Sequence, residues 1–292
     1  MKIGVLCSGN LGFEILKKIY KSYNIEFVLT DKKSINISNF SRTKGIACFS
    51  GNPRNGRGYS FIKNIEIDIL ISVNYLFLIE ADLFNHAKKL SFNIHGSLLP
   101  KNRGRTPHVW AIINGETKTG ITAHVIDDGC DTGAIISQIE VAIDKDDTGA
   151  TILDKYKNLY YPLIEEVISS CKNNSLNFVV QNETDSTYNG KRTPEDGQIN
   201  WNWSSEKILN WIRAQAYPYP GAFTYCKKKK LIIDKVELII DKTFDNDKPG
   251  TIVNVKNNIL VKTQDGVLRL DEIRTKNCTF ELGQILYYED SK

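Results

Sequence analysis

The chain has 292 residues, of which 41% are hydrophobic and 25% are charged, with a formal net charge of +4. This composition is typical of a globular protein of about two domains that can bury a sizeable core. No apolar run reaches the roughly 18 residues that a membrane-spanning helix needs, and the charges are too evenly spread to predict a basic nucleic-acid-binding face.

The six cysteines form neither a C-x-x-C pair nor a regular spacing. The chain starts directly with an apolar strand pattern rather than a signal-peptide pattern. Reduced thiols are the rule in the cytosol, whereas disulfides are typical of secreted proteins. We therefore expect a cytoplasmic location.

The first third of the chain alternates between strand and helix patterns. Residues 67–73 are an almost unbroken apolar run, as burial on both faces of a parallel sheet requires. This alternation predicts an α/β fold with a doubly wound parallel sheet. We expect strands over residues 3–6, 25–30, 46–49, 67–73 and 91–93, and helices over residues 12–23, 36–44 and 80–90.

In the rest of the chain, a polar linker separates a mixed strand-and-helix segment from a series of short strands. The polar stretch 182–200 contains Gly190, Pro194 and Gly197 and is interpreted as a linker. Before it we expect a helix over 106–114, strands over 120–126 and 133–139, and a long helix over 148–173. After it we expect a helix over 204–216 with Ser204 as its N-cap. Five short strands then predict a small β-barrel or sandwich, over residues 222–226, 231–240, 250–255, 258–262 and 267–273. The expected division is therefore a first domain over 1–185, a linker and connecting helix over 186–217, and a C-terminal domain over 218–292.

Doubly wound sheets bind ligands outside the carboxyl ends of their strands. Three loops distant in sequence are expected at that rim: Ser8-Gly9-Asn10, Asn74-Tyr75, and Asn93 to His95. The first of these follows a strand and opens a helix, so its backbone N–H groups could hold a phosphate. Asp31 stands where a ribose-binding acid would lie in a dinucleotide site. Because the G-x-G-x-x-G pattern is absent, we favour a tight turn without a nicotinamide cofactor.

Asn93, His95 and Asp131 carry the chemistry. Side chains two apart on a strand point the same way, so Asn93 and His95 can face one small volume. Asp131 follows on a second, glycine-bounded loop. An amide that stabilises an oxyanion, an imidazole that accepts a proton and an acid that orients it are the groups that move an acyl group onto an amine.

Two other patterns have competing interpretations. His95 and His124 together with Asp127, Asp128 and Asp131 could form a metal site on paper, but the spacing typical of zinc ligands is missing. We therefore expect no metal. The basic turn from Arg103 to Arg105 is either a surface loop or a site for a phosphate or carboxylate.

Several runs resemble the folate-dependent formyltransferases, which include glycinamide ribonucleotide transformylase, methionyl-tRNA formyltransferase and the nucleotide-sugar N-formyltransferases. The resemblance spans essentially the whole chain and is nearest to the module that formylates a UDP-linked aminoarabinose in lipid A modification. The matching runs are 93–100 (NIHGSLLP), 103–107 (RGRTP), 114–116 (NGE), 131–133 (DTG), 192–196 (RTPED) and 216–223 (AYPYPGAF).

The resemblance implies a Rossmann-like catalytic domain followed by a small OB-like barrel. It implies N10-formyltetrahydrofolate as the formyl donor and Asn93, His95 and Asp131 as the catalytic set. The pterin site of the family lies between two loops, which match Asn74, Tyr75 and Leu76 on one side and Ile126 to Asp131, including Asp128, on the other.

Three acceptors remain open after this resemblance. With 38 basic and 34 acidic residues, the chain has little positive charge to hold a tRNA backbone. Glycinamide ribonucleotide enzymes generally lack the C-terminal barrel. We therefore favour a UDP- or dTDP-linked amino sugar, with methionyl-tRNA as the alternative. The pyrophosphate is expected near Ser8, Gly9 and Asn10, with Arg105 or Arg192 as a charge partner.

The family resemblance extends to the biological role. The product is expected to enter O-antigen, lipopolysaccharide or a related surface glycan, with no membrane partner. A non-catalytic folate- or nucleotide-binding protein is the remaining alternative. The oligomeric state stays open, a homodimer included.

Overall fold

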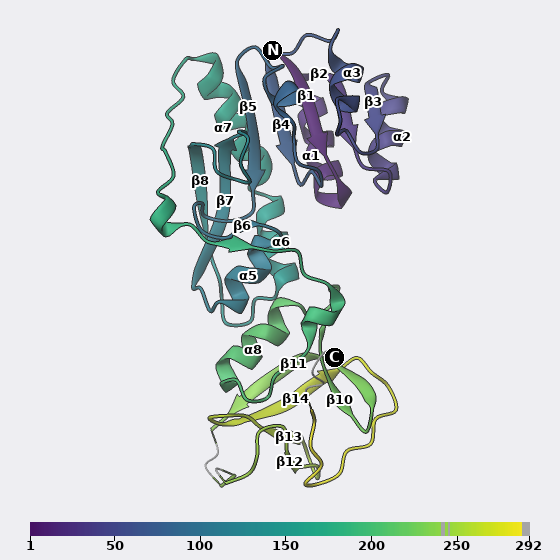
Figure 1. The fold of residues 1–292 in the computed structure, drawn as a ribbon, viewed down its shortest axis with the longest axis vertical. Helices are drawn as coiled ribbons and strands as arrows, with labels where there is room; N and C mark the ends of the chain where they lie inside the picture. The colour runs from purple at the N-terminus through teal and green to yellow at the C-terminus, as the bar shows by residue number, and fades with distance from the viewer. Residues whose placement is uncertain (241–242, 245, 288–292) are drawn as a thin grey trace. The chain divides into compact units, whose positions relative to one another are not determined.

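The computed structural model describes residues 1–240, 243–244 and 246–287 (Figure 1). The chain forms two compact units that interleave along the sequence. The first unit contains residues 1–107, 119–141 and 155–189, and the second contains residues 108–118, 142–154 and 190–292. Within the described residues, no helix combines the length and the apolar character that crossing a membrane requires.

A seven-stranded sheet forms the centre of the first unit, in the order β3-β2-β1-β4-β5-β7-β8 (Figure 1). The neighbours from β3 to β5 pair in parallel, and β7 pairs antiparallel with β5. The expected α/β fold with a mostly parallel sheet is thus confirmed. The strands are β1 (Lys2–Cys7), β2 (Asn24–Thr30), β3 (Ala47–Ser50), β4 (Ile69–Val73), β5 (Leu90–His95), β7 (Lys118–Val125) and β8 (Ile135–Ala142).

Alternate side chains of β1 meet different helices because successive residues of a strand point to opposite faces. Cys7 lies against Gly12 of α1 (Gly9–Ser22), which also contacts α2 (Ile35–Thr43) and α7 (Tyr160–Lys172). Leu6 points the other way, into a buried cluster with Ile62 of α3 (Arg57–Ile62) and Leu83 of α4 (Ala81–Phe84). Helices therefore cover both faces, although the short helix α3 was not expected from the sequence.

The helix expected over residues 80–90 is wrong beyond its first turn. Helix α4 ends at Phe84, and β5 begins at Leu90. The backbone N–H groups of Lys88 and Lys89 donate to Ile67 O and Asp68 O. Ile67 and Asp68 directly precede β4, so these hydrogen bonds draw residues 88–89 toward the sheet. This tertiary pairing overrides the helical pattern.

The single helix expected over residues 148–173 is also wrong. It is divided into α6 (Gly149–Lys157) and α7, which begins at Tyr160. Pro162 lies in the first turn of α7. A continuous helix would press its ring against the carbonyl of residue 158 and lose one hydrogen bond. Proline is tolerated in a first turn, so the helix restarts there.

Residues 181–189, which begin just before the expected linker, fold against the first unit. Strand β9 (Tyr188–Asn189) pairs in parallel with β6 (Arg103–Gly104). A short 3-10 turn, η1 (Glu183–Asp185), precedes it. Polar side chains of this segment form hydrogen bonds to other loops.

The second unit is built on a five-stranded antiparallel sheet in the order β10-β11-β14-β13-β12. Its strands are β10 (Ala222–Cys226), β11 (Lys229–Ile239), β12 (Ile252–Asn254), β13 (Ile259–Lys262) and β14 (Val267–Ile273), and its helices are α5 (Pro107–Ile113), α8 (Ser205–Ala214) and the 3-10 turn η2 (Pro194–Gly197). The five expected strands are confirmed. Residues 288–292 of the C-terminal domain expected over 218–292 lie outside the described residues, as do 241–242 and 245.

Helix α8 packs its apolar side on this sheet. Ile208 and Ile212 are fully buried in one cluster with Trp201 and strand residues such as Leu231. The expected N-cap is confirmed, because the Ser204 hydroxyl accepts a hydrogen bond from the Lys207 N–H at 3.3 Å. Such a cap satisfies one of the free N–H groups of the first turn.

Candidate active site

Four polar side chains meet at the carboxyl end of β5. Asn93 and His95 lie on β5, and His124 of β7 stands directly opposite Asn93 in the antiparallel register. Asp131 reaches them from the loop between β7 and β8. Its Oδ2 lies 3.5 Å from His95 Nδ1, and its Oδ1 lies 3.5 Å from His124 Nε2. The structure therefore brings together the three residues expected to be catalytic and adds His124.

His95 is held in one tautomer. Its ring is buried, and Nε2 lies 2.9 Å from the Asn102 carbonyl oxygen. A carbonyl can only accept, so Nε2 carries the proton and Nδ1 is the basic atom. Burial lowers the pKa of His95 below its usual value, against the opposing effect of the Asp131 carboxylate. His95 is thus a neutral base at pH 7, with Nδ1 facing the carboxylate that would stabilise its charged form.

Asp131 is ionised although it is largely buried. Burial alone would raise its pKa, but His95 and His124, together with the Gly104 N–H, hold the pKa well below its usual range. The Gly104 N–H donates to Oδ2 at 3.0 Å. The backbone of Asp131 is in the left-handed region, with φ of 58°. A non-glycine residue at positive φ is uncommon and occurs where the surroundings impose it, often at functional sites.

His124 was considered from the sequence only as a metal ligand, and its contacts indicate another role. Its Nδ1 lies 2.8 Å from the Val125 carbonyl, so Nδ1 carries the proton and Nε2 accepts. Asn93 Nδ2 lies 3.1 Å from that Nε2. This fixes which end of the Asn93 amide is the NH₂ group and leaves its second N–H available. No sequence motif points to His124. Its place in the site follows from the alternation of side chains along β7 and from the pairing of β7 with β5.

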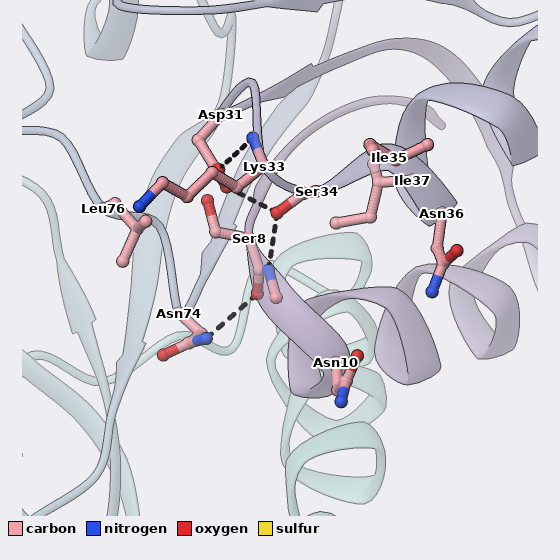
Figure 2. Close-up of a pocket in the computed structure, with 11 residues that line it drawn as sticks. Ser8, Asn10, Asp31, Lys33, Ser34, Ile35, Asn36, Ile37, Asn74 and Leu76 are labelled. Carbon is pink, nitrogen blue, oxygen red and sulfur yellow. Dashed lines mark hydrogen bonds between the residues drawn. The ribbon is translucent and has the colours of Figure 1, made fainter. Parts of the chain in front are cut away.

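A pocket of about 400 Å³ lies at the carboxyl ends of β1, β2 and β4 (Figure 2). Ser8, Gly9, Asn10 and Asn74 line it, and Asn74 Nδ2 donates to Ser8 O at 2.9 Å. The loops after β1 and β4 therefore meet, as the topology predicted. Leu76 also lines the pocket.

Asp31 forms the buried wall of this pocket. The Ser34 hydroxyl donates to its carboxylate at 2.5 Å, and the Lys33 N–H donates at 2.8 Å. Burial opposes ionisation, but these hydrogen bonds hold the pKa of Asp31 below its usual value. The Gly9 N–H at the start of α1 donates to the same Ser34 hydroxyl. The first N–H group of α1 is thus satisfied within the protein.

Each of the two loops expected to hold a pterin combines exposed and buried groups. Asn74 and Asp128 are exposed, and Leu76 is 44% exposed. The Tyr75 hydroxyl is buried and has no hydrogen-bond partner among the residues that the structure describes. Ile126 is buried, and its N–H donates to Ser91 O at 3.0 Å. The accessible apolar and polar groups of Leu76, Asn74 and Asp128 fit a ring that carries several hydrogen-bonding atoms.

The three arginines considered as binding residues from the sequence have different environments. Arg105 is exposed and donates to Leu76 O at 2.9 Å, at the rim. Arg103 is fully buried and binds the Glu183 carboxylate at 2.7 Å, so at Arg103 the turn is no surface loop, and the carboxylate that it binds belongs to the protein itself. Arg192 belongs to the second unit. There its guanidinium lies over the rings of Trp110 and Trp211.

The described residues contain no group of three or more His, Cys, Asp or Glu side chains arranged to hold a metal ion. All six cysteines are free thiols.

Two profiles of one family match successive parts of this sequence. The Formyl transferase family matches residues 26–168, and the Formyl transferase C-terminal domain matches residues 191–281. The chain belongs to the formyl transferase family. It is 35% identical to the bifunctional polymyxin resistance protein ArnA of Wigglesworthia glossinidia brevipalpis, over 86% of this chain. The match covers 38% of ArnA, so the chain spans about two fifths of that relative's length.

Two solved structures share the fold along almost their whole length. WlaRD, a sugar 3N-formyl transferase crystallised in the presence of dTDP and 5-N-formyl-THF, has a TM-score of 0.70 at 24% identity over 95% of this chain and 99% of its own. An N-formyltransferase from Helicobacter canadensis, in complex with folinic acid and dTDP-3-aminofucose, has a TM-score of 0.73 at 22% identity over 94% of this chain and 99% of its own. At these identities the likeness establishes the fold.

Proposed function

We propose that this formyltransferase moves a formyl group from N10-formyltetrahydrofolate to the amine of a nucleotide-linked amino sugar. The pairing of His95 Nδ1 with Asp131 Oδ2, beside the Asn93 amide at the carboxyl end of β5, carries this proposal. The sugar N-formyl transferases of the same fold support it.

Each of the three residues has a role that follows from its contacts. The acceptor amine attacks the formyl carbon and must lose a proton, which His95 takes at Nδ1. Asp131 then faces the imidazolium and stabilises its charge. Asn93 donates its second N–H to the oxyanion that forms on the formyl oxygen. The amide does not need to reorganise at that moment, because His124 already fixes it. When the tetrahedral intermediate collapses, the bond between the formyl carbon and N10 breaks, and His95 returns the proton to N10, so that tetrahydrofolate leaves and the base is neutral again.

For the donor, we propose the loops of Asn74, Tyr75 and Leu76 and of Ile126 to Asp128 as the pterin site. The formyl group that the donor supplies must reach the cluster of Asn93 and His95, and the 126–131 segment joins that cluster at Asp131. The exposed Leu76 and Asn74 support this side.

For the acceptor, we propose the pocket of Ser8, Gly9 and Asn10. The start of α1 favours negative charge, which suits a pyrophosphate. Arg105 is the candidate charge partner at the rim. Arg192 remains a candidate from the sequence, although its stacking on tryptophan rings leaves less of it free for a ligand. The buried Asp31 accepts hydrogen bonds and would bind a hydroxyl rather than a phosphate.

The charge of the chain favours an amino sugar over the alternative, methionyl-tRNA. Binding a nucleic-acid backbone needs several phosphate contacts from basic residues, and the excess here is only +4. The ArnA relative, a polymyxin resistance protein, supports a role in surface glycans such as lipopolysaccharide or O-antigen. The six free thiols support a cytoplasmic location. We also propose that the C-terminal domain is an OB-like barrel. In this proposal the catalytic domain ends at residue 185 and the C-terminal domain begins at residue 218.

A formylation assay with mass-spectrometric detection tests this function. The purified protein is incubated with N10-formyltetrahydrofolate and a panel of UDP- and dTDP-linked 3-amino and 4-amino sugars, with charged methionyl-tRNA as a separate acceptor. Addition of one formyl group to a nucleotide sugar is the expected result. Formylation of methionyl-tRNA alone would replace the proposal by its alternative. Ligand-induced stabilisation without turnover would indicate a binding protein.

A further inference from the structure

Both ring nitrogens of His95 face groups that residues 181–189 hold in place. On the Nδ1 side stands Asp131, whose main-chain carbonyl accepts a hydrogen bond from Gln181 Nε2 at 2.9 Å. On the Nε2 side stands the Asn102 carbonyl. The Asn102 N–H donates to Thr187 Oγ1 at 2.7 Å, and its side chain accepts from Asn189 Nδ2 at 2.7 Å.

Gln181 uses its whole amide in this arrangement. Its Nε2 donates to Asp131 O and, at 2.7 Å, to Gly133 O, on both sides of the loop turn. Its Oε1 accepts from Nε and Nη2 of Arg103 at 3.1 and 2.8 Å. Arginine has no acceptor, so the amide cannot flip without placing its NH₂ group against the guanidinium. Gln181 is also buried, with 6% of its surface exposed.

Arg103 is itself fully engaged. Besides Gln181, it binds both oxygens of Glu183 at 2.7 and 2.9 Å and the Tyr188 hydroxyl at 2.6 Å. These contacts use all five N–H donors of the guanidinium, which is fully buried. A guanidinium fixed by five hydrogen bonds to three residues orients the Gln181 amide more firmly than a lysine could.

We propose that Gln181, oriented by Arg103, is a positioning residue that fixes Asp131 opposite His95 Nδ1. This inference rests on the proposed function of the same site. The loop needs such support, because Asp131 lies at positive φ and no strand pairing fixes it. Small displacements of catalytic groups cost large factors in rate, so a loose Asp131 would lower turnover.

Two substitutions at Gln181 and one matched control test the proposal. Gln181→Ala removes all four hydrogen bonds. Gln181→Glu keeps the acceptors for Arg103 but turns an oxygen toward the carbonyls of Asp131 and Gly133. The control is Gln138→Ala, since Gln138 Nε2 also donates twice, to Leu99 O and Thr122 Oγ1, without touching the Asp131 loop.

We expect kcat to fall by roughly tenfold to a hundredfold in both Gln181 variants, with KM for the formyl donor within about threefold of wild type. Gln138→Ala should lose thermal stability and keep its kcat. A loss of kcat in Gln181→Ala no larger than that in Gln138→Ala, at equal loss of Tm, would refute the positioning role. Gln181→Glu decides the question if the alanine variant does not fold.

A second readout does not depend on activity. Long-range ¹H–¹⁵N spectra of the four histidines report the tautomer and titration of His95. Asp131 and His124 face its ring, and Arg103 and Arg105 flank the same loop beside Cys130. Displacing Asp131 removes a group that raises the His95 pKa, so we expect that pKa to fall in both Gln181 variants and to stay in Gln138→Ala. An unchanged His95 titration would overturn the proposal. If the wild type formylates nothing, the proposed function fails, and this measurement still decides the role of Gln181.

Discussion

His95 Nδ1 faces the Asp131 carboxylate, while the opposite nitrogen of the same ring donates to a main-chain carbonyl. The buried ring therefore has one basic atom, and that atom lies where an acid can stabilise the proton it accepts. Turnover, pH dependence and stability should all depend on this pair.

Replacing His95 by alanine should leave a folded protein with turnover reduced by at least about a hundredfold, because general base catalysis typically contributes that factor or more. The measurement is kcat with the best acceptor from the formylation assay, with circular dichroism as the check of folding. His86→Ala is the matched control, since His86 contacts only Ile65 O among the hydrogen bonds described for it. Near-normal turnover of His95→Ala would remove His95 from the mechanism.

Asp131→Asn keeps the shape of the side chain and removes its charge. The carboxylate raises the His95 pKa, so its loss should lower that pKa further. A base that must be unprotonated would then stay active at lower pH. We expect a lower maximal rate and an acidic limb of the pH–rate profile displaced toward lower pH. A limb that stays in place would mean that another group titrates in the profile.

Asn93→Ala should cost about a hundredfold to a thousandfold in kcat, the range observed for loss of one oxyanion donor. His124→Phe should cost less, because the second N–H of Asn93 survives while its orientation is released. Comparing kcat in the two single variants and the double variant tests this order. Equal and additive losses would show that His124 does not act through Asn93.

Stability should depend on pH through His95. The pKa of His95 in the folded protein lies below the unfolded value of about 6.5. At pH values between these two pKa values, the unfolded chain therefore binds more protons than the folded chain. The free energy of unfolding should therefore fall as the pH drops below about 6.5. Urea unfolding at pH 7.5 and pH 5 checks this, and His95→Gln should flatten the dependence. Parallel curves for wild type and variant would contradict it.

Gly104→Ala should damage the support of Asp131. Gly104 has φ of 96°, and an added Cβ would lie 2.3 Å from Asn189 O. Strain at such a position costs about 1–3 kcal/mol, and the shift would move the N–H that binds Asp131. We expect a lower Tm together with a lower kcat. Gly190→Ala is the control, because its Cβ would meet nothing within 4 Å; equal behaviour of the two variants would contradict the prediction.

Local patterns were sufficient for most elements. The apolar run of β4, the helical spacing of α1 and the serine cap of α8 depend on neighbouring residues, and all three formed as expected. The patterns failed where a distant contact competed with them. Residues 85–89 had a helical pattern, yet the N–H groups of Lys88 and Lys89 donate to the segment that leads into β4.

The sequence by itself determined the α/β class, the five C-terminal strands and the candidates Asn93, His95 and Asp131, because strand alternation and loop position are local properties. The tertiary structure alone decided that His124 faces Asn93, that Arg103 is buried, and that Gln181 reaches Asp131 across 50 residues of chain. These contacts depend on strand register and on the packing of segments far apart in sequence. A hydrogen bond between such segments leaves no periodic signal in either of them.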